Sequence, residues 1–213
     1  PVVQIRDGNG NVSVFEDNDG GQQIYTGPLA VLVNLASASA SEIYSAAIQD
    51  YERGIIIGST TTGKGTAQVQ LDTLAYGQAT LTQRKFYRIT GGSTQNKGVV
   101  PDIKLVDIYN EEFGERKSKN ALKWDTIPTA RFKREGSVQP YVTKLSQFSE
   151  QRVGNDAQFK YLNKRTAIAK VTSDQKQVVL DIDKRRAELL GLEKQTLDAE
   201  NERRAATGQK PFA

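Results

Sequence analysis

Three residue types are missing from this sequence: its 213 residues include no His, no Cys and no Met. Without His, the chain cannot form a Ser-His-Asp triad, an imidazole general base or a His-ligated metal site. Without Cys, it has no thiolate nucleophile, no disulfide and no zinc–thiolate site. Covalent chemistry by this chain would therefore need a Ser or Thr nucleophile, with a Lys or a carboxylate as its base.

The beginning of the sequence lacks two features. The chain opens at Pro1 without an initiator Met and without a charged-then-apolar leader, so we expect a piece of a longer protein. Long apolar runs are missing as well. No stretch approaches the roughly 18 apolar residues of a membrane span, and the mean hydropathy is −0.54. We therefore expect no membrane-spanning segment, whereas the absence of Cys fits either redox compartment.

The net charge of +4 is unevenly distributed along the chain. Residues 1–107 hold 8 Lys and Arg against 10 Asp and Glu, whereas residues 108–213 hold 21 against 15. This change of sign near residue 107 predicts two regions with different roles. No basic patch with interleaved aromatic residues is present, so we expect no nucleic acid among the partners.

The first region has the pattern of an α/β fold. Residues 29–35 form a continuous apolar run typical of a strand buried on both faces, and residues 54–59 form a second one. Residues 37–54 between them have helical spacing, so the three segments predict a βαβ unit with a parallel sheet. We expect further strands at residues 2–6 and in the segments AQVQL, QATLTQ and KFYRIT, with turns at DGNGN and EDNDGG.

The second region is predicted to be helical after a connector. From about residue 139 onward, apolar residues recur every three or four positions between charges. Helices are expected within residues 142–153, 157–171 and 176–206. The predicted division is therefore an α/β domain over residues 1–107 and a connector with a helical region over residues 108–213.

Three serines lie where the first buried strand becomes a helix: Ser37, Ser39 and Ser41. A helix N-terminus offers free backbone N–H groups and positive potential to a developing oxyanion, so a nucleophile is well placed there. Ser39 and Glu42 also fit the S-x-x-E capping box. On local sequence alone, capping is the commoner role of such a serine, and both interpretations stay open.

The second buried strand is followed by Gly58-Ser-Thr-Thr-Thr-Gly-Lys-Gly-Thr66, which is close to a P-loop. Gly65 stands where a P-loop has its hydroxyl residue, and the next segment alternates like a strand rather than opening a helix. We therefore do not expect ATP or GTP binding. For Lys64 itself, a solvated loop lysine is the simplest interpretation.

Ser39 and Lys64 follow successive strands of the predicted parallel sheet, so they are expected to lie at the same sheet edge. A lysine can deprotonate a serine when burial lowers its pKa from about 10.4. Gln68, four residues beyond Lys64, lies on the same face of an extended segment and is placed to orient its amine. A Ser–Lys dyad is thus the nucleophile and base that a chain without His and Cys can build.

The segments VLVNLASASASEIYSAAIQDY, GSTTTGKGTAQ and KFYRITGGSTQNKGVVPDI together resemble the catalytic core of the carboxy-terminal processing peptidases, in their tail-specific branch. The resemblance covers residues 1–107, and residues 108–213 are similar to the C-terminal region of that branch. It implies a crotonase-like (ClpP/crotonase-type) α/β core, incomplete at its N-terminus. It also implies a periplasmic serine endopeptidase that needs no cofactor or metal and cleaves proteins recognised through apolar C-terminal tails.

Carried over from the family, the nucleophile falls on Ser39, the base on Lys64, the orienting glutamine on Gln68 and a functional aspartate on Asp50. Asp50 is 11 residues into the helix from Ser39, about 16 Å along the axis, so we expect it to support the structure rather than relay a proton.

The Gly-rich segment, which supplies a second oxyanion donor, and the PDZ domain of the family would precede Pro1. We therefore expect this chain alone to be a weak or inactive protease. The alternative is a non-catalytic binding module whose basic helical region docks a partner or adaptor protein, although a solvated helical face is the simpler explanation of most of those charges.

Overall fold

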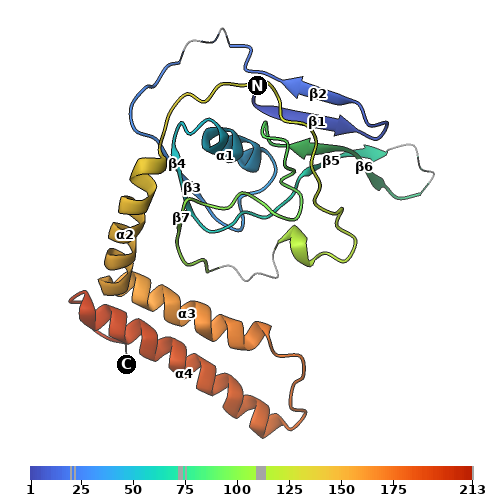
Figure 1. The fold of residues 1–213 in the computed structure, drawn as a ribbon. Coiled ribbons are helices and arrows are strands. Elements are labelled where there is room, and N and C mark those ends of the chain that lie inside the picture. Colours follow the sequence, from blue (N-terminus) through green and yellow to red (C-terminus); the bar gives the residue numbers. More distant parts are fainter. Residues whose placement is uncertain (20, 22, 72–73, 75, 109–113, 213) are drawn as a thin grey trace. The chain divides into compact units, whose positions relative to one another are not determined.

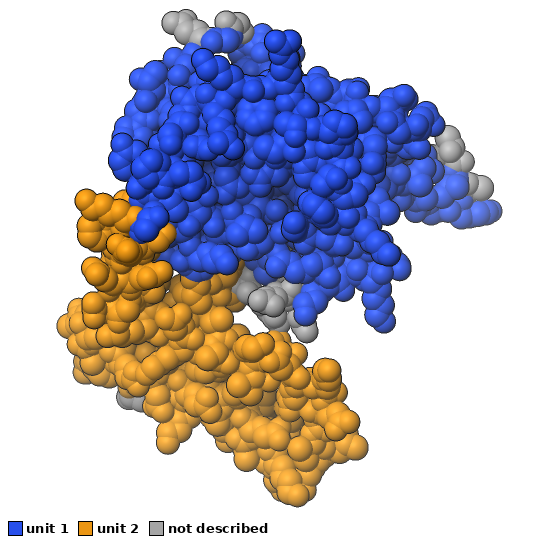
Figure 2. Space-filling view, in the orientation of Figure 1, with its two compact units in different colours: residues 1–105, 111–143 blue, residues 106–110, 144–213 orange. Residues whose placement is uncertain are grey.

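The computed structural model describes residues 1–213 except 20, 22, 72–73, 75, 109–113 and 213. The chain divides into two compact units, coloured separately in Figure 2. The first contains residues 1–105 and 111–143, and the second contains residues 106–110 and 144–213. The described part of the connector, residues 114–138, therefore belongs to the same unit as the α/β region.

A three-stranded sheet carries the predicted βαβ unit (Figure 1). Strands β3 (Ala30–Val33) and β4 (Ile55–Gly58) pair in parallel, and helix α1 (Ala40–Asp50) connects them. The short strand β7 (Ile103–Lys104) pairs in parallel with β4, giving the order β3-β4-β7. These pairings confirm the parallel sheet and place the C-terminal ends of β3 and β4 at one edge. The core of this unit contains Val33, Ala46, Ile56 and Val99.

The prediction that the first strand is buried on both faces is wrong. Leu32 in the middle of β3 is 78% exposed, whereas Val33 is buried. β3 is the end strand of its sheet, and nothing among the described residues covers the face that carries Leu32. The continuous apolar run at residues 29–35 therefore corresponds to a strand with one exposed face.

Gly58 ends β4 with a backbone that only glycine can provide. Its φ is 134°, and a Cβ at this position would lie 1.8 Å from the carbonyl oxygen of Val33. The chain thus leaves β4 pressed against β3, which directs the next loop toward the end of β3 and the start of α1.

A second, antiparallel sheet has the order β2-β1-β6-β5. Its strands are β1 (Val3–Asp7), β2 (Val12–Phe15), β5 (Thr66–Leu71) and β6 (Ala79–Tyr87). The turn predicted at DGNGN joins β1 and β2. The segments QATLTQ and KFYRIT, predicted as two strands, lie largely in the single strand β6, where a register shift marks a bulge opposite Ala67 and Gln68.

The connector is hydrogen-bonded along the loop that follows β6. Ser93 N donates to the Asp125 carbonyl at 3.1 Å, and Ile127 N donates to the Gly91 carbonyl at 2.9 Å. The only Trp of the sequence, Trp124, donates its indole N–H to the Ser93 carbonyl at 2.8 Å. The Lys97 ammonium lies 4.0 Å from the centre of the Trp124 ring. These contacts explain why the described part of the connector belongs to the first unit.

Asp125 of the connector is the acceptor at the centre of a polar cluster on the antiparallel sheet. Its carboxylate lies 2.6 Å from Lys85 Nζ and 2.7 Å from Arg6 Nη2, and it accepts a hydrogen bond from the Tyr87 hydroxyl at 3.1 Å. Burial, followed by the negative charge of Asp125, raises the pKa of Tyr87 to about 12. The cluster ties the connector to both β1 and β6.

The second region is helical as predicted, with helices α2 (Gln139–Asn155), α3 (Ala157–Ser173) and α4 (Ile182–Ala206). The last one starts later than the pattern from residue 176 predicts. Asp181 explains the start, because its carboxylate caps α4 by accepting hydrogen bonds from the backbone of Asp183 and Lys184, each at 3.0 Å. No described helix is long and apolar enough to cross a membrane.

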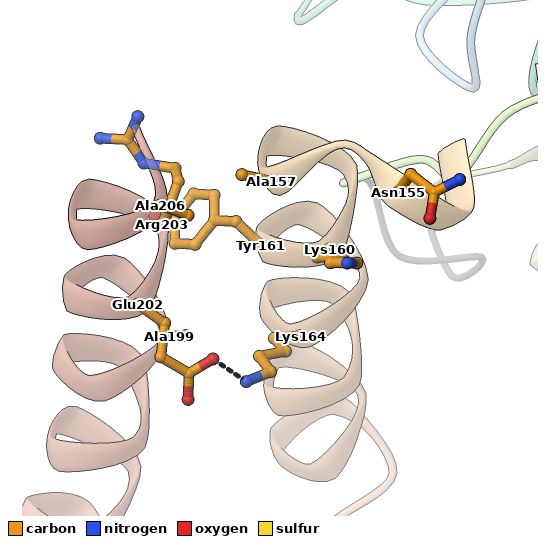
Figure 3. A pocket seen from close by; sticks show the side chains of 9 residues that line it. All are labelled: Asn155, Ala157, Lys160, Tyr161, Lys164, Ala199, Glu202, Arg203 and Ala206. Atoms are coloured by element: carbon orange, nitrogen blue, oxygen red, sulfur yellow. Dashed lines mark hydrogen bonds and ion pairs between the residues drawn. The ribbon is translucent and has the colours of Figure 1, made fainter. Parts of the chain in front are cut away.

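Helices α3 and α4 pack side by side as a hairpin (Figure 1). Figure 3 shows the pocket of about 170 Å³ between them, with Tyr161 directed from α3 toward Arg203 of α4. The Lys164 ammonium pairs with the Glu202 carboxylate across the hairpin. Arg203 binds Glu200 within α4 at 2.6 Å and lies 5.5 Å from the centre of the Tyr161 ring on α3.

Candidate active site

Ser39 is the N-cap of α1 and has an unusual backbone conformation for that position. Its φ and ψ are 57° and −111°, whereas helix N-caps ordinarily lie in the extended region. The caps of α3 and α4 in this chain, Asp156 and Asp181, have φ of −74° and −65° with ψ of 130° and 119°. A non-glycine residue with positive φ is strained, and such strain is concentrated at functional sites. A sharp, strained turn between a strand and a helix is also how α/β-hydrolases present a nucleophilic serine.

The Glu42 carboxylate lies beneath this turn and is fully buried. Its Oε2 atom accepts hydrogen bonds from the backbone N–H of Ser39 and of Lys64, each at 2.9 Å. Its Oε1 atom accepts from the Thr61 hydroxyl at 2.5 Å and from the Gly63 N–H at 2.7 Å. One carboxylate therefore joins the start of α1 to the loop that follows β4.

The structure thus brings the backbones of Ser39 and Lys64 together, because their N–H groups share one oxygen atom. Lys64 is half-buried, and within the described part of the chain its side chain has no ion-pair partner. The sequence predicts that the segments after β3 and β4 lie together at one edge of the sheet. The Glu42 oxygen that accepts from both segments explains how they are held there.

The glycines on either side of Lys64 allow this loop to lie against residues 93–98. Gly65 N donates to the Gln95 side-chain oxygen at 2.8 Å, and Asn96 N donates to the Gly63 carbonyl at 2.8 Å. A Cβ on Gly65 would lie 2.4 Å from Gln95 N. The loop is followed by strand β5, so the departure from a P-loop is confirmed.

Gln68 lies on β5, exposed to solvent. Its Nε2 atom donates to the hydroxyl oxygens of Thr66 at 3.0 Å and Thr82 at 3.4 Å. Among the described residues no hydrogen bond joins it to Lys64, so its orienting role stays a prediction.

Asp50 is at the other end of α1 from Ser39, buried against the loop after β6. Arg88 Nη2 lies 2.5 Å from Asp50 Oδ1, and Arg88 Nε is 3.1 Å from both carboxylate oxygens. The Thr90 hydroxyl is 3.3 Å from Asp50 Oδ2. These partners fasten the C-terminal end of α1 to the antiparallel sheet.

The start of α1 also leaves one backbone donor open. The N–H groups of Ser41, Glu42 and Ile43 are bonded to the carbonyls of Ala38 and Ser39. Among the described residues, the Ala40 N–H has no hydrogen-bond acceptor. It belongs to the residue directly after Ser39, where a donor to an oxyanion is expected.

Glu42 is the residue of this site whose contacts the sequence did not reveal. The capping box accounts only for its bond to Ser39, and the other three bonds come from residues 19 to 22 positions away. The signal in the sequence is the S-x-x-E pattern, which predicts the bond to Ser39 and not the bonds to the loop after β4. No group of three or more acidic side chains that would suit a metal ion occurs among the described residues.

Comparisons with known proteins show which families the two regions match. Residues 1–105 match the family model of peptidase family S41, and residues 108–213 match that of the C-terminal domain of tail specific protease (DUF3340). The tail-specific protease of Haemophilus influenzae is 41% identical over 222 residues, which cover 99% of this chain and 32% of the relative. The carboxy-terminal-processing protease of Bartonella bacilliformis is 43% identical over 86 residues, which cover 40% of this chain and 20% of the relative.

Among solved structures, the photosystem II D1 C-terminal processing protease aligns with a TM-score of 0.43 and 36% identity, over 49% of this chain and 27% of that one. By the family matches, residues 1–105 have the sequence of a peptidase of family S41, and residues 108–213 have the sequence of a C-terminal domain of tail specific protease. The chain belongs to peptidase family S41 and carries the C-terminal domain of the tail-specific proteases. It spans about a third of the length of the Haemophilus relative.

Proposed function

We propose that this chain supplies the nucleophile and the base of a serine endopeptidase that cleaves proteins recognised through apolar C-terminal tails. The observation that carries the proposal is the shared Glu42 oxygen, which holds the backbone of Ser39 beside that of Lys64. The strained conformation of Ser39 supports a nucleophile over an ordinary helix cap. Membership of the peptidase family supports the same reaction.

In the proposed mechanism, the neutral Lys64 amine takes the proton of the Ser39 hydroxyl as the serine oxygen attacks the peptide carbonyl. The open Ala40 N–H donates to the oxyanion that forms. Protonated Lys64 then gives its proton to the leaving amine, and the acyl group stays on Ser39. A water molecule, deprotonated by the regenerated amine, hydrolyses the ester and restores the serine.

Two further residues support the dyad in this proposal. Gln68 orients the Lys64 amine from β5, which requires its side chain to exchange its present hydroxyl partners for the amine. Asp50 acts as a structural anchor, in keeping with its buried ion pair to Arg88. We further propose that the core is crotonase-like, that the protein works in the periplasm, and that its helical region is available to an adaptor.

A serine-directed fluorophosphonate probe tests this function in the full-length protein. We expect the probe to label wild type and the Ser41→Ala variant, because the Ser41 hydroxyl is bonded to the Ala38 carbonyl at the helix start. Ser39→Ala should not be labelled. Lys64→Arg should be labelled at least about 100-fold more slowly, because a guanidinium does not deprotonate in proteins.

Equal labelling of wild type and Ser39→Ala, or cleavage of a tail-bearing protein by Ser39→Ala, would contradict the assignment. Absence of labelling in wild type would favour a binding module. The expectation that the 213-residue chain alone cleaves weakly stays a prediction, to be tested by assaying it beside the full-length protein.

A further inference from the structure

The loop that carries Lys64 is fixed by hydrogen bonds to its backbone from several parts of the chain. Both the N–H and the C=O groups are bonded at four of its residues: Thr61, Thr62, Gly63 and Gly65. Their partners lie in the segment after β3, in α1, in β6, in residues 95–99 and in the connector. Because these partners belong to separate elements, the position of the loop depends on each of them.

Two of these bonds come from a short 3₁₀ helix of the connector, η2 (Glu115–Lys117). Glu115 N donates to the Thr62 carbonyl at 3.0 Å. The guanidinium of Arg116 donates through Nη2 to the Thr61 carbonyl, also at 3.0 Å. The connector therefore lies directly against the loop and supplies donors to two successive carbonyl groups.

A buried glutamine makes a second connection between η2 and the loop. Gln95 is fully buried. Its Oε1 atom accepts from Gly65 N at 2.8 Å, and its Nε2 atom donates to Glu115 Oε1 at 3.1 Å. The amide needs both partners, since turning it over would place a donor against a donor and an acceptor against an acceptor. Glu115 thus fixes the side chain that holds the residue after Lys64.

We propose that Glu115 and Arg116 are positioning residues for Lys64 and act through the backbone of its loop. This inference rests on the proposed function, because it takes Lys64 as the base. A base acts only within hydrogen-bond reach of the proton that it removes, and a displacement of about 1 Å can cost about 100-fold in rate. Both residues lie in the sequence that matches the C-terminal domain of tail specific protease, so that domain contributes to placing the base of the peptidase region.

Two substitutions of Glu115 in the full-length protein test the connection through Gln95. Glu115→Ala and Glu115→Gln remove the same negative charge, but Glu115→Gln keeps an oxygen that can accept from Gln95. We expect the fluorophosphonate probe to label Ser39 at least about fivefold more slowly, per folded molecule, in Glu115→Ala, since a hydrogen bond that fixes the loop is lost. In Glu115→Gln the labelling rate should stay within about twofold of wild type.

Arg116→Ala tests the bond to the Thr61 carbonyl, and Lys117→Ala is its matched control. Lys117 is the next residue of η2, is exposed like Arg116 and carries the same charge. Labelling of Ser39 should slow at least about fivefold in Arg116→Ala and stay within about twofold of wild type in Lys117→Ala. For cleavage of an apolar-tailed protein by Arg116→Ala, kcat should fall while KM stays within about twofold, because the change displaces the base and leaves tail binding intact.

The outcomes separate positioning from a purely structural role and from the proposed function. Urea unfolding gives the folded fraction of each variant, and wild-type labelling per folded molecule in both Glu115→Ala and Arg116→Ala would overturn the inference while leaving the dyad intact. Equal loss in Glu115→Ala and Glu115→Gln, or in Arg116→Ala and Lys117→Ala, would also overturn it, since charge rather than the hydrogen bonds would then matter. Absence of labelling in wild type would overturn the proposed function, and the positioning roles with it.

Discussion

Replacing Glu42 by Gln tests the contacts that hold the proposed nucleophile and base together. The carboxylate accepts two hydrogen bonds at each oxygen, and a Gln side chain offers only one acceptor oxygen. An NH2 group in place of Oε2 would face the N–H groups of Ser39 and Lys64. In place of Oε1 it would face the Gly63 N–H and the Thr61 hydroxyl, so the Gly63 N–H and the Thr61 O–H would each lose their acceptor, while the Thr61 oxygen could accept from the new NH2 group. The second arrangement is therefore the one expected.

The cost follows from these contacts. An unpaired buried N–H costs about 1–3 kcal/mol. The bonds from Ser39 and Lys64 change from a charged to a neutral acceptor, which costs about 1 kcal/mol more in total. Relief of the buried negative charge offsets part of this loss. We expect the free energy of unfolding to fall by about 2–3 kcal/mol, and labelling of Ser39 in the folded variant to slow at least about tenfold.

Urea unfolding of the chain measures the first effect, and the fluorophosphonate probe measures the second. Glu150→Gln is the matched control, because Glu150 is exposed on α2 and should change stability by less than about 0.5 kcal/mol. If Glu42→Gln unfolded like this control and labelled like wild type, the carboxylate would not be what joins the two loops.

Three other predictions concern residues outside the site that stabilise the fold. Gly58→Ala should lower the free energy of unfolding by more than about 4 kcal/mol, or prevent folding, since its Cβ would overlap a carbonyl of β3; Gly191→Ala in α4, where space is open, should raise it by about 0.5–1 kcal/mol in the same urea assay. Asp50→Asn should cost about 2–4 kcal/mol by weakening a buried ion pair, with Ser39 labelling lost only in proportion to the unfolded fraction; loss in fully folded protein would refute a purely structural role. Stability should fall as the pH rises from 10 to 12, because Tyr87 keeps its proton up to a pKa of about 12 in the folded state and releases it near 10 in the unfolded chain; the decline should be smaller in Tyr87→Phe, where only the raised pKa of Tyr51 still contributes to it.

Local patterns in the sequence sufficed for most elements of the fold. The helix that became α1 and the strands β3 and β4 have strong periodicity or apolar content, and their parallel pairing follows from the order of the elements. Two errors came from tertiary context. A strand's apolar run does not show whether both its faces are covered, as Leu32 demonstrates. The helical pattern that begins at residue 176 does not show that Asp181 would cap the helix instead.

The site divides in the same way. The proximity of Ser39 and Lys64 could be predicted because both follow adjacent parallel strands. The part played by Glu42 could not, because three of its four partners are close only after the loop behind β4 has folded. The side-chain partners of Gln68 were also beyond the sequence, since Thr82 reaches it from the neighbouring strand.

The contacts of the connector have a consequence for how the two regions of this chain can be exchanged by recombination. The two family matches meet between residues 105 and 108, but the first compact unit extends to Thr143. A recombinant joined at that boundary to a C-terminal domain without an aspartate equivalent to Asp125 would leave the buried Lys85 ammonium without its carboxylate. An exchange that keeps these contacts intact would therefore have to place its boundary after residue 143, where the first compact unit ends, and not between the two family matches.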